Sequence, residues 1–218
     1  MKPLNRSLYH IILIIIIWNP AYSQTSVYDT DIQNTRKLPN LIISIDEESL
    51  ERAYLSREVI SAEEYQGEEV SGQFYSSVYQ EDIRINDAAT LFSRYLEREL
   101  LSDETSPAGE IILKLTYYDY DYNNTIGSFF NVISFGLGYL AGIPGNVMKT
   151  TVELDLVILD SEMKKVAEFS GTGRKKCYEG LYFPKRDIRD LNLLALKEAL
   201  LSVNTQIMND YDSIVEDL

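Results

Sequence analysis

The sequence predicts an α+β fold with a three- to four-stranded, mostly antiparallel sheet and helices packed on one of its faces. Apolar and polar residues alternate over 110–120 and again over 150–159, which is the period of a half-buried strand. Apolar residues recur at helical spacing over 86–101 and 186–211. Because the segments follow in the order strand, helix, helix, three-stranded meander, helix, we expect the helices on one face of the sheet.

The amino-terminal half begins with a short apolar run over 41–46, which predicts a first buried strand. Residues 47–58 carry apolar side chains at helical spacing and predict a short helix. The stretch 60–80 is ambiguous, because residues 74–79 alternate in a way that suits an edge strand or an extended loop.

The first clear helix covers 86–101, and Asn86 or Asp87 is expected to cap it. The meander follows: strands over 110–120 and 150–159, a polar turn over 160–164, and a third strand over 166–173 that could continue to Tyr178. In the second strand, Leu154 and Leu156 alternate with acids and should face the helices.

The first 23 residues have the pattern of a secretory signal peptide. Lys2 and Arg6 make a basic start, 11–18 is an apolar core, and 21–23 offers small residues for cleavage. We expect the mature chain to begin at Gln24 and the protein to be exported, to the periplasm, the outer membrane or the medium.

The remaining chain is expected to form a single α+β domain over 40–212. A flexible leader is predicted over 24–39 and a carboxy-terminal tail over 213–218. Removal of the signal peptide leaves 18 basic against 34 acidic residues, a net charge of −16. A charge this negative argues against a nucleic-acid partner, since phosphates are bound mainly by Lys and Arg.

The module resembles small exported envelope proteins of gram-negative bacteria, many of them lipoproteins. The likeness covers roughly residues 40–210 and includes the polar turn Asp160-Ser161-Glu162-Met163-Lys164 and the alternating strand that starts at Thr150. The lipid-acceptor cysteine of such lipoproteins is absent near the expected cleavage site, and this departure puts membrane tethering in doubt. The resemblance assigns no functional residues.

The connection between the first two meander strands, about 122–148, carries no charged side chain in an otherwise acidic protein. Long connections of this kind are usually functional or disordered, and the composition argues against disorder. The third strand returns the chain to the same end of the sheet, where it brings a basic cluster that includes Arg189. The candidate interaction residues are therefore Phe129, Phe130, Phe135, Leu137, Tyr139 and Leu140 on the connection and Arg174, Lys175, Lys176, Lys185 and Arg186 in the cluster.

Several functions stay open for these residues. The leading hypothesis is a non-enzymatic envelope module that docks through the apolar connection on a partner protein or a membrane surface. One alternative is a binder or carrier of a small apolar ligand between the connection and the sheet, and another is a hydrolase that uses two carboxylates. The connection could also fold back over the sheet and complete the core. No catalytic residue, metal ligand or cofactor is assigned, and the oligomeric state is left open.

Overall fold

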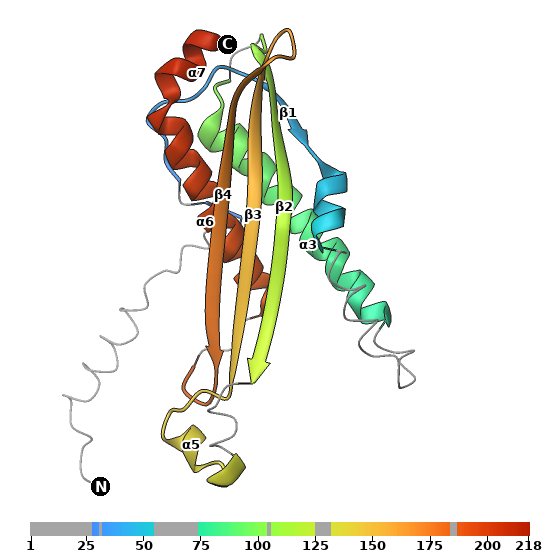
Figure 1. Ribbon diagram of the computed structural model, residues 1–218, viewed down its shortest axis with the longest axis vertical. Coiled ribbons are helices and arrows are strands. Elements are labelled where there is room, and N and C mark those ends of the chain that lie inside the picture. Colours follow the sequence, from blue (N-terminus) through green and yellow to red (C-terminus); the bar gives the residue numbers. More distant parts are fainter. Residues whose placement is uncertain (1–27, 31, 55–73, 104–105, 125–131, 184–186) are drawn as a thin grey trace, which may run out of the picture.

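The computed structural model describes residues 28–30, 32–54, 74–103, 106–124, 132–183 and 187–218. Three long strands, β2 (Gly109–Asn124), β3 (Asn146–Asp160) and β4 (Lys165–Glu179), form an antiparallel meander. The short strand β1 (Ile42–Ile45) pairs in parallel with β2 and completes a four-stranded sheet in the order β1-β2-β3-β4 (Figure 1). The predicted α+β fold is confirmed, with one parallel pair beside the meander.

Helices lie behind the meander in Figure 1 and cover one face of the sheet. Residues 47–54 form a short helix directly after β1. Helix α3 (Phe74–Arg94) continues into a π-helical segment, η1 (Tyr95–Leu100). After β4 come α6 (Ile188–Asn209) and the short helix α7 (Tyr211–Asp217).

The core lies between this face of the sheet and the helices. Leu154, Leu156 and Ala195 are fully buried in one cluster, so the predicted orientation of β3 is confirmed. The same cluster includes alternate residues of β2 and apolar residues of α3, η1 and α6: Ile111, Leu113, Leu115, Leu91, Phe92, Leu96, Leu196, Ala199 and Val203. The residues between them on β3, such as Glu153 and Asp155, are only partly buried, which makes the other face polar.

Two glycines on β4 let α6 lie very close to the sheet. An ideal Cβ on Gly173 would lie 1.8 Å from the carbonyl oxygen of Ala195, and one on Gly171 would lie 2.4 Å from that of Ala199. Because the helix also has alanine at both contact points, backbone meets backbone without intervening side chains. This contact sets the position of α6 across β4.

The amino-terminal segment differs from the flexible leader predicted over 24–39. In its described part Ile32 and Leu38 are buried, and Leu38 forms a parallel bridge with Leu101. The Asn34 side chain exchanges hydrogen bonds of 2.7 and 2.8 Å with the buried amide of Asn204. The prediction is wrong for these residues because two apolar side chains are enough to attach the segment to the core. Within a polar stretch these two side chains form no periodic pattern that would indicate a buried element.

Three other expectations need correction. Residues 74–79 belong to α3 and form neither an edge strand nor a loop, and Asn86 and Asp87 therefore lie inside the helix and do not cap it. The expected tail over 213–218 is mostly helical, because α7 folds onto β4 with Ile214 buried. The core thus extends beyond both ends of the predicted 40–212 domain.

Candidate functional site: an exposed apolar tip

At one end of the sheet, the three strands of the meander end at the same level. Asn124, Asn146 and Glu179 are in register across β2, β3 and β4. The strands are longer than predicted, so the connection between β2 and β3 spans 125–145 instead of 122–148. Its described part, from residue 132, lies beyond the strand ends with helix α5 (Leu137–Leu140) at the extremity (Figure 1).

The connection has a hydrogen-bonded structure of its own around α5. The Ser134 hydroxyl accepts a hydrogen bond of 3.1 Å from the Gly138 amide at the start of the turn. At its end the Ile143 amide donates to the Gly138 carbonyl over 2.9 Å, and Gly142 has a φ of +84°. A bond of this span beside a glycine with positive φ is typical of a Schellman ending.

Most apolar side chains of this turn point to solvent. Phe135 is 98% exposed, Leu137 64% and Leu140 61%. The described part of the connection therefore does not fold back to complete the core. We call the exposed apolar residues at this end of the molecule the apolar tip: Val132, Ile133, Phe135, Leu137, Leu140, Ile143, Leu181 and Tyr182.

Leu181 and Tyr182 come from a second segment, directly after β4. The Tyr182 hydroxyl donates a hydrogen bond of 3.0 Å to the carbonyl of Leu140, which joins the two segments. Sequence reasoning missed both residues, although the signal was present: an apolar Leu-Tyr-Phe follows the strand that returns to this end.

A polar cluster forms the base of the tip. The Tyr122 hydroxyl donates to the Glu179 carboxylate over 2.8 Å, and the Asn146 amide donates to the same oxygen over 3.0 Å. The Gly145 amide donates to the Glu179 carbonyl over 2.9 Å. These bonds tie the ends of all three meander strands together, so the tip is mounted on a well-connected base.

The basic cluster lies a few residues behind the tip on β4. Arg174 and Lys176 are exposed, and Lys176 pairs across the strands with the exposed Lys149. The Lys176 ammonium lies 4.6 Å from the ring centre of Tyr178. Lys175 is on the helix-covered face, where its ammonium lies 3.2 Å from the Glu198 carboxylate.

Arg189 does not belong to this cluster. Its guanidinium makes two hydrogen bonds with the carboxylate of Asp87, which is almost fully buried on α3. The bonds to Asp87 raise the pKa of Arg189 above its usual value. The expectation that Arg189 joins the other cations at the tip is wrong because this buried carboxylate engages it.

Several predicted interaction residues lie outside the described part of the chain. These are Phe129, Phe130, Lys185 and Arg186, together with the side chain of Tyr139. The structure brings Phe135, Leu137 and Leu140 together at the tip and places Arg174 and Lys176 behind them.

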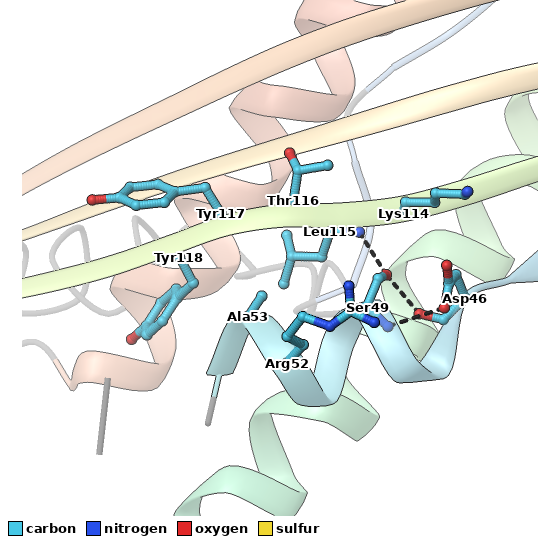
Figure 2. Close-up of a pocket in the computed structure, with 9 residues that line it drawn as sticks. All are labelled: Asp46, Ser49, Arg52, Ala53, Lys114, Leu115, Thr116, Tyr117 and Tyr118. Carbon is cyan, nitrogen blue, oxygen red and sulfur yellow. Dashed lines mark hydrogen bonds between the residues drawn. The ribbon is translucent and has the colours of Figure 1, made fainter. Parts of the chain in front are cut away.

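A surface cavity of about 400 Å³ lies away from the tip, beside the bulge of β2 between Leu115 and Tyr117 (Figure 2). The Ser49 hydroxyl lies in the wall of this cavity and accepts a hydrogen bond of 3.0 Å from the Leu115 amide. Charged side chains, including Arg52 and Lys114, share the lining with two tyrosines. A second cavity of about 310 Å³ lies between the start of β4 and α7, at the end of the sheet that is opposite the tip. Neither cavity is the pocket between connection and sheet that the carrier hypothesis requires.

Within the described ranges, no helix is long and apolar enough to cross a membrane. In that same part of the chain, no group of three or more His, Cys, Asp or Glu side chains could hold a metal ion. No protein-family model matches the sequence, and no curated protein matches it.

Proposed function

We propose that this chain is a non-enzymatic, exported module of the bacterial cell envelope that docks through its apolar tip. The target is a partner protein or a membrane surface. The observation that carries the proposal is the exposure of Phe135, Leu137 and Leu140 on a turn with its own hydrogen bonds. Contiguous exposed apolar patches mark interaction sites in soluble proteins.

Energetics favour a docking role for the tip. Burying one leucine or phenylalanine side chain contributes about 1.5–3 kcal/mol relative to leaving it exposed. The fold already has a closed core, and the tip side chains lie beyond it at the end of the sheet. Burial of these side chains can therefore stabilise a complex between the tip and another surface.

Export is the second element of the proposal and rests on the amino-terminal pattern. The basic start, the apolar run over 11–18 and the small residues before Gln24 support cleavage in an envelope-directed pathway. Amino-terminal sequencing of the protein from envelope fractions should find a start at or near Gln24. Recovery of intact Met1 from those fractions would contradict it.

The docking experiment compares two variants in cells. Leu137→Ser combined with Leu140→Ser removes two exposed side chains of the tip, and Leu201→Ser removes one that is 52% exposed on α6. We expect the tip variant to shift from the particulate envelope fraction to the soluble one, while Leu201→Ser distributes like the unmodified protein. Equal distribution of all three proteins would contradict docking through the tip.

The carrier alternative has less support. The cavity beside the β2 bulge has a suitable volume for a small molecule. Its lining, however, includes Asp46, Arg52 and Lys114, and an apolar ligand would leave these charges poorly solvated.

A further inference from the structure

We infer that the surface met by the tip is the lipid–water interface of an anionic membrane, which the tip enters end-on and to a shallow depth. This inference rests on the proposed docking function and names its target. Three observations carry it: the order of side-chain types along the long axis, the charge difference between the two ends, and the absence of charged residues across the described tip.

Side-chain types change in sequence along the meander. Helix α5, with Leu137 and Leu140 exposed, lies at the extremity (Figure 1), and the exposed Phe135 precedes it by two residues. Exposed tyrosines follow on the strands, Tyr122 two residues from the end of β2 and Tyr178 one residue from the end of β4. At a rise of about 3.3 Å per residue, Lys176 lies roughly 10 Å behind the end of β4. From the extremity inward, the apolar tip, the tyrosines and the cations follow one another in the order of the acyl chains, the interface and the headgroup phosphates of a lipid leaflet.

The two ends of the molecule differ in charge. Among the six residues of each meander strand nearest the tip, four are basic and three are acidic, and 132–145 adds no charge. Lys149 pairs with Asp121 and Lys175 with Glu198, which leaves Arg174 and Lys176 as the cations that face outward. At the opposite end, α7 has three acidic residues, Asp212, Glu216 and Asp217, and no basic one, while the turn between β3 and β4 balances Asp160 and Glu162 with Lys164 and Lys165. An anionic surface therefore repels the far end and admits the tip, and screening beyond about 8 Å limits the effect of the overall negative charge.

The composition of the tip favours lipid over a protein partner. Protein interfaces combine an apolar centre with a rim of polar groups that form about one hydrogen bond per 100–200 Å². Between residues 132 and 145 the chain has no charged side chain, and backbone groups of α5 are hydrogen-bonded to Ser134, Ala141, Ile143 and Tyr182. A surface of this kind meets the requirements of an apolar medium, where unsatisfied polar groups are costly.

The depth of entry is limited by the structure. Helix α5 has four residues, and the polar strand ends follow within a few residues on either side. A segment of this length cannot span a bilayer, which needs about 20 residues. Insertion to the 5–10 Å typical of interfacial elements therefore immerses only the tip and leaves Arg174 and Lys176 on the aqueous side, facing the headgroups.

The test uses the purified full chain and vesicles of phosphatidylcholine with or without about 30% phosphatidylglycerol, an anionic lipid that attracts basic residues near the membrane surface. We expect flotation with the anionic vesicles. The variant Leu137→Ser/Leu140→Ser should bind at least roughly 10-fold more weakly, and Leu201→Ser should bind like the unmodified protein. Arg174→Ser/Lys176→Ser should lose the preference for anionic vesicles and keep weak binding to the neutral ones. The predicted signal peptide is common to all of these proteins, so only the differences between them are interpreted.

A second readout reports position. Tryptophan replaces Leu140 in one variant and Leu201 in another, and both keep Trp18 as a shared background. Brominated lipids should quench the fluorescence of Leu140→Trp more than that of Leu201→Trp. Equal quenching, or equal flotation of the tip variant and the unmodified protein, would overturn the lipid proposal.

The outcomes separate this inference from the docking function. If the tip variant leaves the envelope fraction in cells while the unmodified protein ignores both vesicle types, the target is a protein and only the lipid proposal falls. If sedimentation velocity shows a dimer that dissociates in the tip variant, a second copy covers the tip and the lipid proposal again falls. If neither envelope association nor vesicle binding depends on the tip, both proposals fall.

Discussion

Asp87 on α3 and Arg189 on α6 form a two-point ion pair that joins the two helices covering the sheet. The guanidinium Nε bonds to Oδ2, and Nη2 donates to Oδ1 over 2.8 Å. The Tyr28 hydroxyl donates to the same Oδ1 over 2.7 Å. One nearly buried carboxylate therefore connects the amino-terminal segment with two helices that are far apart in sequence.

Replacing this carboxylate should destabilise the fold. Asp87→Asn removes the charge that Arg189 faces and is expected to cost about 1–3 kcal/mol, in the range for hydrogen bonds to charged groups. The lower part of the range applies because Arg189 is about half exposed and water can solvate it. Urea titration measures the change.

The matched control is Asp212→Asn, whose partner Arg36 and own carboxylate are both exposed. That substitution should change the free energy of unfolding by less than about 0.5 kcal/mol. If the two variants unfold at the same urea concentration, the pair of Asp87 with Arg189 does not contribute to the attachment of α6.

A second prediction concerns the contact between β4 and α6. Gly173→Ala places a methyl group 1.8 Å from the Ala195 carbonyl oxygen, so the helix must move. We expect a loss of at least about 1–3 kcal/mol, the usual cost of overpacking. Thr172→Ala is the control, because Thr172 is exposed on the other face of the same strand. Equal stability of both variants in guanidinium titration would show that α6 is free to shift.

Much of the sheet could be predicted because its strands alternate regularly. Ile111, Leu113 and Leu115 on β2 all lie in the core, as the period of two indicates. The register of β3 follows the same logic, because a slip of one residue would bury Glu153 and Asp155. Here the local pattern and the tertiary structure agree.

The elements that were misassigned lack such a pattern or carry a misleading one. In residues 74–79 the set Phe74, Ser76 and Val78 alternates with Tyr75, Ser77 and Tyr79, which imitates a strand, yet these residues belong to helix α3. Asp87 is a common capping residue, and its bonds to the distant Arg189 and Tyr28 explain its place inside a helix. Leu38 is isolated among polar residues, and its bridge to Leu101 is set by tertiary packing alone.

The candidate site was predictable in position and only partly in composition. The lack of charge over 122–148 located the apolar tip, and strand topology located the cations behind it. The sequence could not show that Lys175 would turn toward Glu198, because that depends on which face α6 covers. The contribution of Leu181 and Tyr182 depends on the length of β4, whose end was left open between residues 173 and 178.

Stability should fall at alkaline pH. Burial raises the pKa of Tyr54 and of Tyr95 above the ordinary value of 10.0, so both keep their protons in the folded chain when the unfolded chain has lost them. Above pH 10 the folded state therefore binds more protons, and the free energy of unfolding decreases as pH rises. Below pH 10 this contribution is fully present.

Removing one of these hydroxyls should reduce the alkaline slope. Tyr95→Phe is expected to lower the slope by up to about 1.4 kcal/mol per pH unit, one proton's worth, even though it also loses the hydrogen bond to Asn204. Urea midpoints at pH 8 to 11 give the slope. A slope unchanged by Tyr95→Phe would show that Tyr95 titrates alike in the folded and unfolded chains.

The last prediction separates a docking tip from a core element by stability alone. Leu137 and Leu140 are more than 60% exposed, so replacing both with serine removes little buried apolar area. We expect the thermal midpoint of the double variant to match that of the unmodified protein, with a change in free energy of no more than about 0.5 kcal/mol. Leu156→Ala provides the contrast, because its fully buried side chain should cost about 2–5 kcal/mol. Differential scanning calorimetry of the three proteins decides the point: a tip variant that unfolds with Leu156→Ala places the connection in the core and removes the basis for docking.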